Sequence, residues 1–63
     1  MVTRAELSSL ETALRELAER IAAGADGLMG TPNEDVASDL YDAERSLRTA
    51  RRRLMRASDG LRG

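Results

Sequence analysis

The sequence predicts an all-α protein: an antiparallel two-helix hairpin with coiled-coil-like packing, paired with a second copy into a homodimeric four-helix bundle. Three observations lead to this fold class. Leucine and alanine recur at alternating spacings of three and four residues along two segments of similar length. A glycine-rich stretch, GADGLMGTP, separates the two segments. Tyr41 is the single aromatic residue, and an apolar set of Leu, Ala, Val, Ile and Met favours helices over sheets.

The first predicted helix spans about residues 4–26. Thr3 followed by Glu6 fits a capping box, in which each side chain bonds the backbone N–H of the other residue. An apolar stripe follows, interrupted at Gly24 and flanked by Ala13, Ala18, Ala22 and Ala25. The members of this stripe are Leu7, Leu10, Leu14, Leu17, Ile21 and Leu28.

A turn is expected at about residues 27–31, because two glycines within it can adopt the left-handed conformation that ends a helix. Thr31, Pro32 and Glu34 then repeat the helix-start signal. Thr31 is the candidate N-cap, and Pro32 suits the first helical position, where its missing N–H does no harm. The pattern leaves the end of the first helix open among the glycines of this stretch.

The second predicted helix spans about residues 32–59, with Gly60 as its stop. Its apolar stripe keeps the spacing of four and three, with leucine at one heptad position and mostly alanine at the other. Alanine at a contact position lets a neighbouring helix approach to the short end of the usual range, about 8 Å between axes. The members of this stripe are Val36, Leu40, Ala43, Leu47, Ala50, Leu54 and Ala57.

The short chain predicts self-association. A domain of 63 residues without cysteine has no disulfide to supplement a marginal core. A lone hairpin also leaves the flanking alanines, Tyr41 and Met55 in water, whereas a four-helix bundle covers them. We therefore expect a homo-oligomer, most simply a dimer, held by the residues of the two stripes. Which contacts lie within one chain and which between chains is left open.

The residue types exclude most chemistry. The chain has no His and no Cys, so the usual acid–base, nucleophilic and transition-metal groups are missing. Carboxylate pairs on the helices are interpreted as solvated faces rather than metal ligands. We expect a non-catalytic protein without cofactor or metal. No apolar stretch is long enough to span a membrane, and we expect a cytoplasmic protein. The use of Arg and never Lys is typical of a GC-rich bacterial genome.

Charge is sorted along the second helix. Residues 34–44 carry five acids and no base, while residues 45–62 carry seven arginines and one acid. The spacing predicts an ion pair of Glu44 with Arg48 and one of Asp42 with Arg45. The next three arginines are expected to fan across the outer face. The candidate contacts with a partner are Tyr41, Arg45, Arg48, Arg51, Arg52, Arg53 and Arg56.

Three interpretations of this basic segment differ in the partner that they imply. A solvated helix end that matches the helix dipole needs no partner and is favoured. An acidic protein surface comes second. Nucleic acid comes last, because the formal net charge of the chain is −1 and nucleic-acid binding needs a clear positive field.

The sequence therefore predicts a small protein–protein interaction or regulatory module that self-associates. Two alternatives belong to other classes. One is a nucleic-acid-binding accessory protein that uses the arginines of the second helix. The other is a structural subunit of a hetero-complex. No motif of a known family is complete in the chain, so the sequence assigns none.

Overall fold

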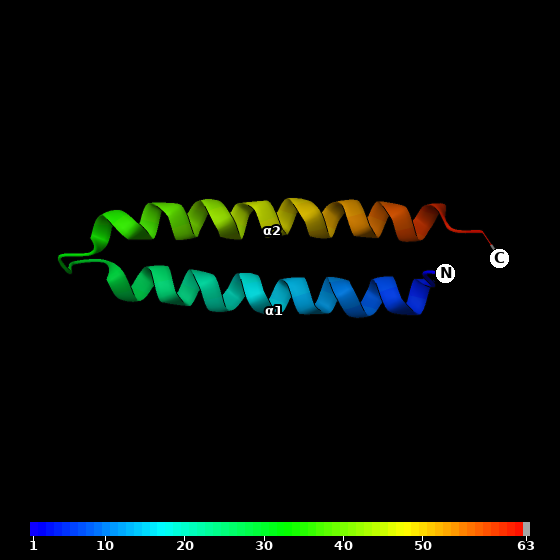
Figure 1. Ribbon diagram of the computed structural model, residues 1–63, viewed down its shortest axis with the longest axis horizontal. Coiled ribbons are helices and arrows are strands. Elements are labelled where there is room, and N and C mark those ends of the chain that lie inside the picture. Colours follow the sequence, from blue (N-terminus) through cyan, green and yellow to red (C-terminus); the bar gives the residue numbers. More distant parts are fainter. Residues whose placement is uncertain (63) are drawn as a thin grey trace.

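The chain folds into two helices that lie side by side and run in opposite directions (Figure 1). The computed structural model describes residues 1–62. Helix α1 spans Arg4–Leu28 and helix α2 spans Glu34–Gly60. The prediction of an all-α antiparallel hairpin is confirmed. Helix α1 continues two residues beyond its expected end, and α2 begins two residues later than expected.

Helix α1 begins with one half of the predicted capping box, the bond to the Thr3 side chain. The Thr3 hydroxyl oxygen accepts a hydrogen bond from the backbone N–H of Glu6 at 3.1 Å. This bond satisfies one of the N–H groups that have no partner within the first helical turn. The cap therefore fixes where α1 starts.

The turn differs from the prediction in the role of Thr31. Its hydroxyl donates to the Leu28 carbonyl at 2.6 Å and accepts from the backbone N–H of Asn33 at 3.2 Å. Because the hydroxyl is engaged within the turn, it does not cap α2. Asn33 takes the N-cap position without a side-chain bond. Gly30 supplies the left-handed conformation, with φ 76°.

Two hydrogen bonds join the two sides of the hairpin. At the open end, the Arg4 guanidinium donates to the Leu61 carbonyl at 2.8 Å. Nearer the turn, the Tyr41 hydroxyl donates to the Asp26 carboxylate. The helices are therefore aligned over their whole length, and the first and last described residues lie at the same end of the hairpin (Figure 1). The hairpin measures 52 × 14 × 14 Å.

The core between the helices is thin. Its buried apolar residues are one leucine and three alanines: Leu7, Ala18, Ala25 and Ala37. None of the large side chains in residues 1–62 is fully buried. Two helices meet along a single line, so each can hide only a narrow strip of its surface. The surfaces that the hairpin leaves uncovered are therefore its candidate functional sites.

Candidate functional site

The leucine-bearing side of each helix consists of three parallel rows. We call the middle one the leucine row: Leu7, Leu14, Ile21 and Leu28 on α1, and Leu40, Leu47 and Leu54 on α2, with Leu61 directly after that helix. The inner row holds Glu11, Ala18 and Ala25 on α1, and Ala37, Glu44, Arg51 and Ser58 on α2. The outer row holds Leu10, Leu17 and Gly24 on α1, and Val36, Ala43, Ala50 and Ala57 on α2.

The two helices contact each other through the leucine row and the inner row. Ala18, Ala25 and Ala37 of the inner row retain only 5%, 0% and 1% of their exposed surface. Leu10 and Leu17 of the outer row are 50% and 44% exposed. The outer row therefore faces solvent, although its leucines are larger and more apolar than the inner-row alanines.

Both outer rows lie on the same side of the hairpin. Residues at equivalent heptad positions of two antiparallel helices flank their line of contact on one side. Each outer-row residue directly precedes an inner-row position, as Leu17 precedes Ala18 and Ala43 precedes Glu44. The outer rows of α1 and α2 together form one continuous surface, which we call the apolar face.

The contact line between the helices contains charged residues. The Glu44 side chain is only 15% exposed, and its carboxylate lies 2.7 Å from Nε of Arg48. Arg51 Nε is buried and has no hydrogen-bond partner among the described residues. A buried charge destabilises a fold unless it is well paired. The single hairpin thus half-buries two charged side chains, Glu44 and Arg51, and leaves large apolar side chains exposed.

The structure divides the thirteen residues predicted to carry assembly. Leu7 is buried. The half-buried members are Leu14, Ile21, Leu28, Leu40, Leu47, Ala50 and Leu54. The exposed members are Leu10, Leu17, Val36, Ala43 and Ala57, all from the outer row. The leucine row therefore serves the contact within the hairpin, while the outer row forms the apolar face.

Sequence reasoning missed the alanines that carry the closest contact. It treated Ala18 and Ala25 as residues beside the stripe and did not single out Ala37. A signal was present, because the inner row of α1 continues without a gap, whereas the outer row is interrupted at Gly24. The inner row reads as a contact row only if the charged Glu11 is allowed to stand in it beside the alanines.

A groove of about 370 Å³ lies between the helices on the side opposite the apolar face. Two of the residues that line the groove directly follow a leucine of the leucine row: Arg15 follows Leu14, and Arg48 follows Leu47. Outer-row residues lie on the other side of that row. The apolar side chains that line the groove are Leu14, Ala18, Leu47 and Met55. The charged side chains that line it are Arg15, Glu19, Arg48, Arg51 and Arg52.

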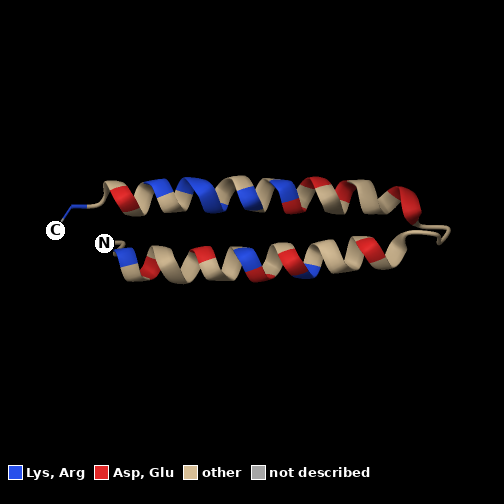
Figure 2. Ribbon diagram, turned by 180° about the vertical axis from the view of Figure 1, so that it is seen from behind, with Lys and Arg blue, Asp and Glu red and all other residues tan. Residues whose placement is uncertain are grey.

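The arginines of α2 occupy two environments. Arg51 is half-buried at an inner-row position, seven residues after Glu44, and does not fan outward as predicted. The other candidate contacts on this helix are exposed: Arg45, Arg48, Arg52, Arg53 and Arg56. Figure 2 shows basic residues gathered along the C-terminal half of α2 and acidic residues at its start.

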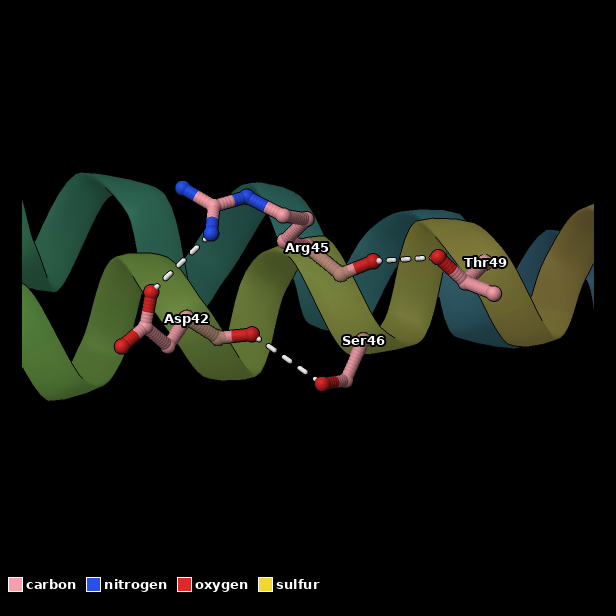
Figure 3. A network of polar contacts seen from close by, with 4 residues as sticks. All are labelled: Asp42, Arg45, Ser46 and Thr49. Carbon is pink, nitrogen blue, oxygen red and sulfur yellow. Dashed lines mark hydrogen bonds and ion pairs between the residues drawn. The ribbon is translucent and has the colours of Figure 1, made fainter.

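Both predicted ion pairs of α2 are confirmed. Besides the Glu44–Arg48 pair, an Arg45 guanidinium nitrogen lies 3.2 Å from the Asp42 carboxylate. The neighbouring hydroxyls of Ser46 and Thr49 donate to backbone carbonyls one turn earlier, at 3.1 Å and 3.2 Å (Figure 3). This strip of α2 therefore satisfies its own polar groups, and Arg45 is already engaged within its helix.

Tyr41 is half-buried beside the contact line and joins the two helices. Its hydroxyl donates to the Asp26 carboxylate, and this hydrogen bond is the main reason why the pKa of Tyr41 is raised above its ordinary value of 10.0. Tyr41 was predicted as a partner contact. In the hairpin its polar end is occupied by a contact within the chain.

Comparisons with known proteins assign no relative: no family model, no curated protein and no solved structure matches the chain. Within residues 1–62, neither helix is apolar enough along its length to cross a membrane. The same residues hold no group of three acidic side chains placed to bind a metal ion together. The apolar face and the arginine-lined groove are therefore the two surfaces from which a function can be inferred.

Proposed function

We propose that this protein is a non-catalytic protein–protein interaction or regulatory module, placed in the cytoplasm, that self-associates through the apolar face into a homodimeric four-helix bundle. The observation that carries the proposal is that the single hairpin exposes large apolar side chains and places charged side chains between its helices. Leu10, Leu17 and Val36 are each 44–50% exposed, while Glu44 and Arg51 occupy the contact line. Covering the apolar face removes those side chains from water, which is the main driving force for association.

A second copy of the chain is the occupant that fits this face best. Four-helix bundles place an apolar sector of each helix toward a shared core. With the apolar face covered, the leucine row stands in the middle of that sector and the inner row at its edge. The charged residues of the inner row then lie at the rim of the bundle, where charge is better tolerated than at its centre.

The distribution of charge favours one of two dimer arrangements. With both turns at the same end, α2 lies over α1 of the other copy. Its acidic residues 34–44 then face residues 21–31, which contain Asp26 and no base. With the turns at opposite ends, α2 lies over α2, and residues 34–44 of each copy face the basic residues 45–62 of the other. Opposite charges attract across this second interface, so we assign it to the dimer.

The same arrangement suits the shapes along α1. Helix α1 crosses its own copy near Leu17, which places Leu10 of one chain opposite Gly24 of the other. A Cβ atom added at Gly24 meets no heavy atom within 4 Å in the single chain. The glycine therefore leaves space for a leucine from the second copy, in the manner of a knob entering a hole.

The oligomeric state tests the proposal. We expect the wild-type chain, with a mass of 6.9 kDa, to elute with twice that mass in size-exclusion chromatography with light scattering at micromolar concentration. Leu17→Glu places a charge in the centre of the apolar face and should give a monomer. Ala23→Glu adds the same charge at an exposed site away from that face and should remain a dimer.

Two results would contradict self-association: a folded wild-type monomer at micromolar concentration, or a Leu17→Glu variant that stays dimeric. Circular dichroism of the same samples separates folding from assembly, since a folded hairpin has strong helical minima. An isolated chain that is unfolded would instead indicate a subunit of a hetero-complex, whose partner supplies the missing contacts.

A further inference from the structure

The groove opposite the apolar face combines an apolar floor with a basic rim. Leu14, Leu47 and Met55 supply apolar surface, and the small Ala18 between them leaves the hollow. Four arginines and a single acid, Glu19, line the same groove. A second copy bound to the apolar face does not cover this side of the hairpin. The groove is therefore accessible whether or not the chain dimerises.

The guanidinium groups of this groove have few partners of their own. Arg48 is paired with Glu44, whereas Arg15 and Arg51 make no hydrogen bond or ion pair within residues 1–62. Arg52 donates only to the neutral hydroxyl of Thr49, at 3.2 Å. Guanidinium groups bind carboxylates through two parallel hydrogen bonds, so the rim is suited to carboxylates from outside the chain.

We propose that the groove binds an acidic amphipathic helix of another protein. A ligand that fits both parts of the site must bring apolar side chains for the floor and carboxylates for the rim. On one face of a helix, leucines at spacings of three and four with glutamates beside them meet both requirements. The third helix lies between α1 and α2, in the same way that a helix occupies a groove between two others.

Charge complementarity selects this ligand over a nucleic acid. The binding of nucleic acid rests on many phosphate contacts along an extended positive surface. The net charge of the chain is −1, and residues 34–44 present five acids on the same helix as the basic rim. The rim is basic over a short distance and encloses apolar side chains, which match leucines better than a phosphate backbone.

Peptide binding to the full-length protein tests the proposal. The probe is a fluorescein-labelled peptide of about 14 residues, enough for roughly four helical turns, with leucines in a three–four pattern flanked by glutamates. The control is the same peptide with lysine in place of each glutamate. Fluorescence anisotropy should show binding of the acidic peptide, with an affinity that falls as salt is raised, and no binding of the lysine peptide.

Two variants of one helix provide the matched comparison. Arg52→Gln removes a rim guanidinium and should weaken peptide binding roughly tenfold, as expected for the loss of a charge-assisted hydrogen bond. Arg56→Gln removes the same charge from an exposed site outside the groove and should change the affinity less than about twofold. An equal loss of peptide affinity in both variants would mean that the general positive charge of this helix end attracts the peptide. That result would overturn the groove as the binding site.

Two further results would overturn the proposal: no binding of the acidic peptide at low salt, or preferential binding of a short duplex DNA in the same assay. The Leu17→Glu variant keeps this test separate from self-association. It has an intact groove, so it should bind the acidic peptide as tightly as the wild type does, even where dimerisation itself is lost or was never present.

Discussion

Arg51 shows how much one residue affects this small fold. It stands at an inner-row position with its Nε buried and no hydrogen-bond partner among the described residues. A buried polar atom without a partner costs about 1–3 kcal/mol, because it has lost its water and gained nothing in return. The hairpin therefore tolerates a local defect where a leucine or alanine would pack well.

Replacing this arginine by an apolar residue should stabilise the hairpin. We expect Arg51→Leu to raise the free energy of unfolding by about 1–2 kcal/mol, since it removes the unpaired group and adds apolar contact. Urea unfolding, followed by circular dichroism at one protein concentration, measures the change. Arg53→Leu at an exposed position serves as the control and should shift the same free energy by less than about 0.5 kcal/mol. Equal effects in the two variants would argue against the buried defect.

Tyr41 offers a second test at the scale of a residue. As the single tyrosine, it alone gives the phenolate signal in an ultraviolet pH titration. Its pKa should exceed 10.0 in the folded chain and fall toward that value in Asp26→Asn, while Asp42→Asn should leave it unchanged. A wild-type pKa equal to that of the unfolded chain would contradict the hydrogen bond to Asp26.

The raised pKa also links Tyr41 to stability. The fold favours the neutral phenol, so its contribution is complete below pH 10 and is lost as the pH rises through the raised pKa. Urea unfolding should therefore show a falling free energy of unfolding in that range for the wild type. The fall should be smaller in Asp26→Asn.

Hydrogen bonds and ion pairs within one helix were predictable from the sequence, and the hydrogen bond between the two helices was not. The Glu44–Arg48 pair follows from a spacing of four residues, and the Thr3 cap from its position before an apolar stripe. The bond between Tyr41 and Asp26 depends on the register of the two helices. That register is set by the length of the turn, which the pattern left open.

At the scale of the elements, the turn shows where local signals compete. The second helix was expected to start with Thr31 as its cap, followed by Pro32. Thr31 can satisfy either the start of α2 or the free carbonyl at the end of α1, and it bonds Leu28. The glycines indicated that a turn exists. Its boundaries depended on which backbone group the Thr31 hydroxyl bonds, and the sequence did not decide this.

Two glycines near this turn should respond in opposite ways to substitution by alanine. Gly27 lies within α1, and an added Cβ there meets no heavy atom within 4 Å, so Gly27→Ala should stabilise the hairpin by about 0.5–1 kcal/mol. Gly30 has φ 76°, and Gly30→Ala should destabilise it by about 1–2 kcal/mol. Thermal and urea unfolding of both variants measure the changes. Shifts of the same sign would contradict an end of α1 at Leu28.

The heptad rows show a similar limit. Sequence reasoning recognised the leucine row and paired it with the outer row, because that pair is the more apolar. The single hairpin uses the leucine row with the inner row instead, since three alanines let the helices approach closely. Periodicity located the broad apolar sector, but it did not decide which edge of that sector the partner helix within the chain would cover.

At the scale of the whole molecule, cross-linking distinguishes the two dimer arrangements. The chain has no cysteine, so Leu17→Cys introduces a single thiol on the apolar face. With the turns at opposite ends, the two copies of residue 17 lie near each other, and mild oxidation should give a disulfide-linked dimer. Asp26→Cys, nearer the turn of α1, is the control and should stay reduced, because its two copies then lie toward opposite ends of the bundle.

Non-reducing electrophoresis reads out both variants. Efficient linkage through residue 26 without linkage through residue 17 would refute the arrangement with turns at opposite ends. Linkage through neither residue, in a sample that light scattering shows to be dimeric, would refute it as well.

The bond between Arg4 and Leu61 has a consequence for anything joined to this chain. It holds the beginning and the end of the hairpin together at one tip of a rod 52 Å long. In the proposed dimer the two tips that carry chain ends point away from each other. Domains fused to either end would then be displayed at opposite poles, with the bundle serving as a spacer of fixed length between two cargoes.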